Sequence, residues 1–120
     1  ALYHPHRKAL PIERLNLADI GSLEFSAPDF KKYPALALAY EVLDIGGLSG
    51  AVYNAAKEVA LDAFIDRKIG FLMMADVVRG VLESVFDGPN MPLSEPSLEN
   101  ILQMDHIGRL EAETKIQRII

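Results

Sequence analysis

Residues 49–70 read SGAVYNAAKEVALDAFIDRKIG, and they predict the helix around which the rest of the fold is arranged. Apolar side chains recur there at the spacing of one helical face, at Val52, Ala56, Val59, Ala60, Ala63 and Phe64. Ser49 is the expected N-cap, and Arg67 and Lys68 would complement the carbonyl end before Gly70. Because alanine lets helix backbones approach closely, we expect this helix to be central.

A second helix is predicted just upstream, over residues 34–45. Its expected buried face follows the i, i+3, i+4, i+7 spacing of Leu36, Ala39, Tyr40 and Leu43. Pro34 suits the first helical position, where its missing N–H would be unpaired anyway, and Gly46-Gly47 supplies a left-handed stop. Both ends of this helix are therefore signalled.

Two more helical segments are predicted downstream. The first has an apolar face of Phe71, Met74, Ala75, Val78, Val81, Leu82 and Val85. It should be broken by Gly88-Pro89, with Pro92 and Pro96 extending the loop. After the loop, Ser97 is expected to cap a short turn, and Asp105 to cap a separate final helix that runs to Ile119.

The first 33 residues read differently, because they contain three prolines and no sustained helical period. We interpret residues 1–33 as a linker arm with one short strand over residues 22–26. Its apolar residues imply that it lies against something. The predicted fold class is all-α: a small four-helix bundle over residues 34–120, preceded by an extended linker arm.

Composition narrows the function classes. Seventeen acidic against twelve basic residues give a net charge of −5, which argues against nucleic-acid binding and anionic membranes. No run approaches the roughly 20 apolar residues of a membrane span. Cysteine is absent, which is compatible with a reducing compartment, so a cytoplasmic location is expected. The chain opens on Ala rather than Met, which suggests either processing or a segment of something longer.

Several stretches of the sequence occur together in one enzyme family. They are LNLADIGSLEF (15–25) with APDF (27–30), YPALALAYE (33–41) with Gly46-Gly47, YNAAKEVA (53–60) continuing to KIGF (68–71), and EPSL (95–98). In order and spacing they resemble the C-terminal region of 1-deoxy-D-xylulose-5-phosphate reductoisomerases. The chain departs from the family at Lys57, where asparagine is usual, and at Leu72-Met73-Met74, which lacks the usual acidic residue.

The resemblance implies a function for a larger parent chain. These enzymes convert 1-deoxy-D-xylulose 5-phosphate to 2-C-methyl-D-erythritol 4-phosphate, using NADPH and Mg or Mn, in non-mevalonate isoprenoid biosynthesis. A homodimeric parent is implied too, and the segment's partners would be the catalytic and NADPH-binding domains of the same chain. No family ligand position falls within these 120 residues. We therefore assign no catalytic, cofactor-binding or metal residue here, and expect the isolated segment to be inactive.

The alternative function is a stand-alone helical protein-interaction module.

A few residues could have either a functional or a purely structural role. His4 and His6 form a His-x-His pair without a third ligand nearby, so a solvated pair is favoured over a metal site. Asn54 and Glu58, one helical turn apart, could face a cleft, but a buried hydrogen-bonding role that fixes their helix against the linker is favoured. The methionines suggest gap-filling core: Met73, Met74, Met91 and Met104. The final helix suggests a solvated charged face: Arg109, Glu111, Glu113, Lys115 and Arg118.

Overall fold

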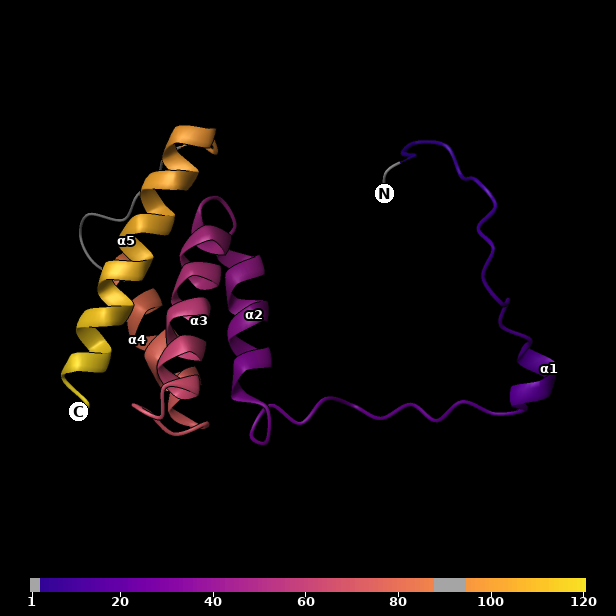
Figure 1. The fold of residues 1–120 in the computed structure, drawn as a ribbon, viewed down its shortest axis with the longest axis horizontal. Coiled ribbons are helices and arrows are strands. Elements are labelled where there is room, and N and C mark those ends of the chain that lie inside the picture. Colours follow the sequence, from indigo (N-terminus) through magenta and orange to yellow (C-terminus); the bar gives the residue numbers. More distant parts are fainter. Residues whose placement is uncertain (1–2, 88–94) are drawn as a thin grey trace.

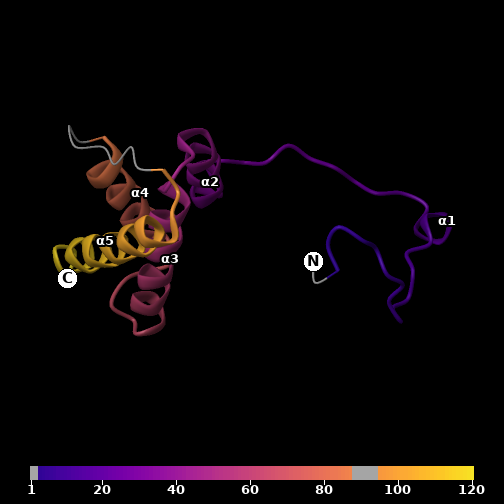
Figure 2. The same ribbon diagram turned by 90° about the horizontal axis from the view of Figure 1, so that it is seen from above.

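The computed structural model describes residues 3–87 and 95–120, and it contains five helices and no strand over those ranges (Figure 1). They are α1 (Leu17–Ile20), α2 (Pro34–Ile45), α3 (Ser49–Ile65), α4 (Met73–Phe86) and α5 (Leu98–Gln117). Helices α2 to α5 pack around one core, while the arm leaves the bundle at α2 in both ribbon views (Figures 1 and 2). The predicted all-α class is confirmed.

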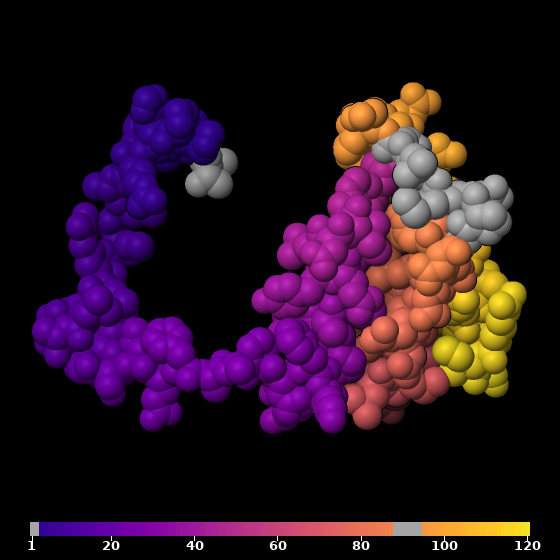
Figure 3. Space-filling view, turned by 180° about the vertical axis from the view of Figure 1, so that it is seen from behind, coloured from indigo at the N-terminus to yellow at the C-terminus, as the bar shows by residue number. Residues whose placement is uncertain are grey.

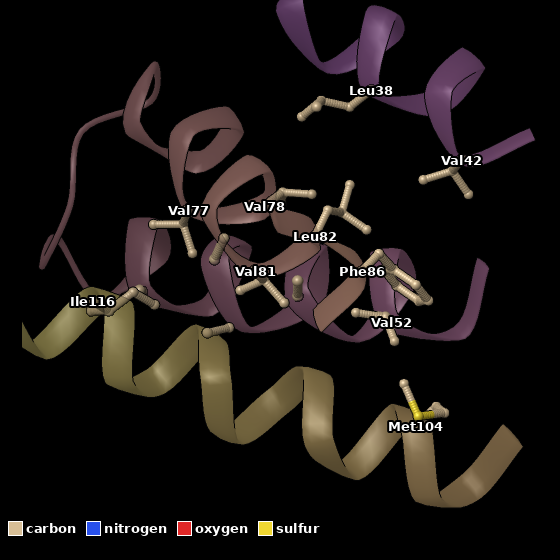
Figure 4. Packing of buried hydrophobic residues seen from close by; sticks show 14 of the residues in the cluster. Leu38, Val42, Val52, Val77, Val78, Val81, Leu82, Phe86, Met104 and Ile116 are labelled. Carbon is tan, nitrogen blue, oxygen red and sulfur yellow. The ribbon is translucent and has the colours of Figure 1, made fainter. Parts of the chain in front are cut away.

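Helix α3 is central, as its alanines predict: it packs against α2, α4 and α5. Its buried residues are mostly small, which brings neighbouring backbones close: Ser49, Val52, Ala55, Ala56, Ala60 and Ala63. Figure 4 shows aliphatic side chains from the other three helices pointing toward this face. The helix ends at Ile65, earlier than expected, because Arg67 takes the left-handed conformation (φ 60°) and Lys68 N donates to Ala63 O at 2.8 Å.

The predicted N-cap role of Ser49 is wrong. Ser49 is the first helical residue, its side chain is 1% exposed, and it makes no cap to α3. Its hydroxyl lies instead 2.9 Å from Val42 O and 2.7 Å from Gly46 O, as a donor to carbonyls at the end of α2. A cap needs a free N–H of its own helix within reach, whereas here the nearer partners are carbonyls at the end of α2, which already accept the backbone N–H groups of Gly46 and Ser49 and take the hydroxyl as a further donor.

The face predicted for α2 is also wrong. Leu38 and Val42 are the buried residues, whereas Leu36, Tyr40 and Leu43 are exposed and Ala39 is half-buried. Figure 4 shows Leu38 and Val42 turned toward the core. Helix α2 is apolar on two sides, so the i, i+3, i+4, i+7 pattern alone did not distinguish the side that the bundle uses.

Helices α4 and α5 differ from prediction at their starts. Helix α4 begins at Met73, and Phe71 stays exposed before it, with its ring edge-to-face on Phe64 at 5.7 Å. Helix α5 is continuous: Ser97 caps it as expected, with Asn100 N donating to Ser97 Oγ at 3.1 Å, but Asp105 lies inside it. Asp105 could not be a cap because the apolar face of Met104, Gly108, Ala112 and Ile116 continues past it. Residues 88–94 of the expected loop, with Met91, lie outside the described residues.

The strand expected over residues 22–26 is not found. A strand needs a partner for its backbone groups, and none of the described segments pairs with it. The one regular element of the arm is the single turn α1, where Ala18 N donates to the Asn16 side chain at 3.1 Å. Every described residue up to Tyr33 is exposed, and the radius of gyration is 18.6 Å. A compact chain of this length would have about 14 Å.

Helix α5 approaches α3 most closely at Gly108. A Cβ there would lie 3.1 Å from Ala55 Cβ, 3.1 Å from Val52 O and 3.2 Å from Val52 Cα. Two of these atoms are backbone, so they cannot move aside as a flexible side chain would. The approach of α5 to α3 therefore depends on this position having no side chain.

We expect Gly108→Ala to destabilise the bundle by about 1–2 kcal/mol, because overpacking outweighs the gain in helix propensity. Gly80→Ala in α4 is the matched control, since a Cβ there meets only the flexible Lys115 side chain at 3.5 Å. It should be neutral or stabilising by up to about 1 kcal/mol. Urea unfolding compares the two. Equal effects of both substitutions would contradict the close approach.

Ser49→Ala should destabilise the bundle by about 1 kcal/mol, because a buried hydroxyl hydrogen bond to the carbonyls at the end of α2 is lost while those carbonyls keep their backbone donors. The exposed Ser84 of α4 provides the control, and Ser84→Ala should change the free energy of unfolding by less than about 0.5 kcal/mol. Urea unfolding followed by circular dichroism measures both. A Ser49→Ala protein as stable as the Ser84→Ala protein would show that the hydroxyl contributes nothing.

Candidate functional site

The best organised polar group in the described residues joins α3 to α5. Arg109 Nη2 donates to Glu58 Oε2 at 2.6 Å, while Arg109 Nε donates to Asp105 Oδ2 at 2.8 Å. Asn54 Nδ2 completes the group by donating to Glu58 Oε1 at 2.9 Å. We call Asn54, Glu58, Asp105 and Arg109 the polar cluster. It links two helices whose residues are 51 positions apart in sequence.

The charges of the polar cluster stabilise one another. Hydrogen bonds from Arg109 and then Asn54, followed by the charge of Arg109, lower the pKa of Glu58 below its ordinary value. Hydrogen bonds to Asp105 and then Glu58 raise the pKa of Arg109. Glu58 is thus held as a carboxylate, and its lowered pKa makes it a weak general base near neutral pH. The cluster is suited to holding helices together rather than to proton transfer.

This geometry revises two predictions. Asn54 and Glu58 do form a hydrogen bond, but it is exposed and not buried as expected, and Glu58 connects α3 to α5 and not to the linker. Arg109 is not part of a purely solvated face, because it bonds to Glu58 across the helix interface. The i, i+4 spacing of Asp105 and Arg109 was a usable signal for part of the cluster. No pattern in the sequence indicated the bond between Arg109 and Glu58.

A hollow with a volume of about 410 Å³ lies between the C-terminal halves of α3 and α5. Its walls carry Asp62, Asp66 and Glu113 against a single cation, Lys68, which pairs with Asp66 at 2.9 Å. This net negative lining repels the phosphates of a dinucleotide. This hollow therefore does not suit NADPH.

Metal-binding side chains do not gather within residues 3–87 and 95–120, where no three His, Asp or Glu are grouped as a metal site needs. His4 and His6 lie exposed in the arm. Three methionines lie in the described part of the chain. Met104 is buried, Met73 and Met74 are half-buried, and all three contact the core as predicted. That the segment binds no metal remains a prediction.

No described helix combines the length and apolar character that crossing a bilayer requires.

Comparison with known proteins identifies the larger context. A model of the family described as DXP reductoisomerase C-terminal domain matches residues 1–111. A 1-deoxy-D-xylulose 5-phosphate reductoisomerase of Ruegeria sp. (strain TM1040) is 50% identical over 109 residues, covering 91% of this chain and 28% of the relative. The chain belongs to the DXP reductoisomerase family, as its C-terminal domain.

Solved structures agree with this assignment. The reductoisomerase from Zymomonas mobilis, in complex with NADPH, matches with a TM-score of 0.78 and 37% identity over 96% of this chain and 29% of its own. A DOX-P reductoisomerase in complex with magnesium matches with a TM-score of 0.77 and 32% identity, over 98% of this chain and 30% of its own. The chain thus spans less than a third of the length of these reductoisomerases.

Lys57, where the family usually has asparagine, lies apart from the polar cluster. It lines an apolar groove of about 230 Å³ between α2, α3 and α4, together with Leu38, Tyr53 and Leu61. The neighbouring Glu58 points to α5 instead and keeps its bond to Arg109. Lys57 therefore takes no part in the hydrogen bonds of the reductoisomerase domain's polar cluster.

The polar cluster predicts how stability depends on pH. Since folding lowers the pKa of Glu58, its contribution is complete above the ordinary value of 4.5 and is lost as pH falls through the lowered value. Glu58→Gln should therefore destabilise the domain at neutral pH, and the difference from the unsubstituted domain should shrink in acid. Urea unfolding from about pH 7 to about pH 3 tests this. Glu113→Gln, an exposed site on α5, is the control; a Glu58→Gln difference that does not change with pH would contradict the expectation.

Proposed function

We propose that these 120 residues are the C-terminal structural domain of an NADPH- and divalent-metal-dependent reductoisomerase. We call this helical domain the brace, because it supports the catalytic portion without taking part in the reaction. The whole enzyme converts 1-deoxy-D-xylulose 5-phosphate to 2-C-methyl-D-erythritol 4-phosphate in isoprenoid biosynthesis. The observation that carries this proposal is the match of residues 1–111 to the C-terminal domain of that family. It favours the enzyme over a stand-alone interaction module. Residues 1–33 act as the arm and residues 34–120 as the domain.

The chemistry is assigned to the part of the parent chain that precedes this domain in the family. NADPH would supply the hydride there, and Mg²⁺ or Mn²⁺ would polarise the oxygens of the substrate. The hollow between α3 and α5 supports this assignment, because its acidic walls do not suit a dinucleotide such as NADPH. What this segment contributes is a rigid surface of fixed shape. The α3–α5 contact at Gly108 and the polar cluster keep that surface in one geometry.

The proposal also includes a cytoplasmic enzyme that assembles as a homodimer. The cysteine-free sequence is compatible with a reducing compartment. Cell fractionation followed by immunoblotting would test the location, and light scattering of the full-length protein would test the assembly. The proposed roles of the brace and of the catalytic portion do not depend on the location or on the oligomeric state.

Calorimetric titration of NADPH separates the two parts of the parent. The 120-residue chain should give no binding heat, whereas the full-length protein should bind NADPH and consume it only with 1-deoxy-D-xylulose 5-phosphate present. Removing divalent metal with a chelator should abolish turnover by the full-length protein, and adding Mg²⁺ should restore it. Micromolar binding of NADPH by the 120-residue chain would contradict the proposal, as would a full-length protein without metal-dependent turnover.

A further inference from the structure

Helix α2 has a second apolar face that the bundle does not use. Leu36, Tyr40 and Leu43 are 39%, 53% and 75% exposed, and their spacing puts them on one side of the helix. At 3.6 residues per turn that side lies opposite Leu38 and Val42, which fill the core. We call Leu36, Tyr40 and Leu43 the outer face of α2. No charged side chain belongs to it.

The outer face continues into the arm. The ring of Phe30 stands edge-to-face on Tyr40, with centroids 5.8 Å apart and planes at 89°. Beyond Phe30 the arm carries further exposed apolar side chains: Leu10, Ile12, Leu15, Leu17, Ile20, Leu23 and Phe25. The arm leaves from the start of α2 and curves round, so that a wide hollow lies between it and the bundle (Figure 3). Phe30 therefore connects the outer face to an arm that carries further exposed apolar side chains.

The chain exposes more surface than a compact monomer of its mass would. Its exposed surface is 9591 Å², whereas a compact monomer would expose about 6400 Å². The excess includes polar and apolar surface, and the extended arm contributes to it because all its described residues are exposed. Burying apolar side chains is the main favourable term in association. The exposed apolar side chains of the arm and of the outer face therefore indicate a missing partner.

The solved relatives indicate which partner is missing. The Zymomonas mobilis enzyme superposes on 96% of this chain, a share that must include most of the arm, yet this region is only 29% of that protein. The outward course of the arm therefore occurs in a protein that has far more chain to place around it. A second copy of the segment is not needed to explain the exposed surface.

We propose that the outer face of α2, together with Phe30, docks on an apolar surface of the larger, catalytic portion of the same parent chain. The inference rests on the proposed function, because it requires that such a portion exists. It goes further by naming the contact that holds the brace in place. The arm wraps the catalytic portion from one side while the outer face of α2 closes on it from the other, so the bundle is held at two separated points.

The test uses the full-length enzyme carrying Leu36→Glu and Leu43→Lys together. The acid lies near the start of α2 and the base near its end, so both suit the helix dipole and the net charge is unchanged. Hydrogen exchange of residues 22–45 should become faster by about tenfold or more, while the α3 and α4 core keeps its protection. Leu102→Glu with Leu110→Lys on α5 makes the same swap at two exposed leucines and should leave residues 22–45 unchanged.

A second measurement needs no substitution and so does not depend on how the variant folds. In hydroxyl-radical footprinting of the unsubstituted enzyme, Tyr40 should be modified about tenfold less than expected for its exposure in this segment, whereas the exposed His106 of α5 should react fully. Full reaction at Tyr40 would overturn the proposal. So would equal exchange in the two double variants, or a loss of dimer mass by light scattering in the α2 variant alone, which would make the outer face a contact between copies.

These readouts are independent of catalysis. If the full-length protein shows no NADPH-dependent turnover but Tyr40 is protected, the proposed function fails while the docking surface stands. If the enzyme is active and Tyr40 reacts fully, the docking surface fails while the proposed function stands.

Discussion

The approach of α5 to α3 at Gly108 is the constraint on which the bundle depends. A Cβ at Gly108 would lie 3.1 Å from a backbone oxygen of α3, so even the smallest side chain there would require the two helices to shift apart. With α5 this close, Arg109 reaches Glu58 and Met104, Ala112 and Ile116 reach the core. The same closeness lets α3 be covered by three helices at once. The hydrogen bonds of the polar cluster fix the position of α5 along α3, which contacts between small apolar residues alone would not do.

Helix α2 shows how one element can serve two surfaces. Its inner side contributes Leu38 and Val42 to the core, and Ser49 ties its C-terminal carbonyls to the start of α3. Its outer side, with Phe30 against Tyr40, is continuous with the arm. A helix that is apolar on both sides belongs between two bodies. This is the property expected of a helix that packs in the bundle on one side and, as proposed, contacts the larger part of the parent chain on the other.

The candidate site illustrates the limits of sequence reasoning. The spacing of Asn54 and Glu58, and of Asp105 and Arg109, indicates two pairs along two helices. Nothing in the sequence says that the pairs meet, since that depends on the side of α5 which faces α3 and hence on Gly108. The charged final helix was interpreted as solvated because isolated charges favour water. Arg109 departs from this because a carboxylate on the neighbouring helix satisfies it at 2.6 Å.

The sequence by itself determined the all-α class, the bounds of α2, the Ser97 cap and the central place of α3, because these depend on local spacing, capping and residue size. Its matched stretches were also enough to indicate the family to which the chain belongs. Only the tertiary structure decided which side of α2 is buried, that Ser49 serves α2 rather than α3, that α5 is continuous, and that residues 22–26 form no strand. Each of these depends on which group a neighbouring segment brings within reach. Periodicity along one segment contains no information about the segment that will face it.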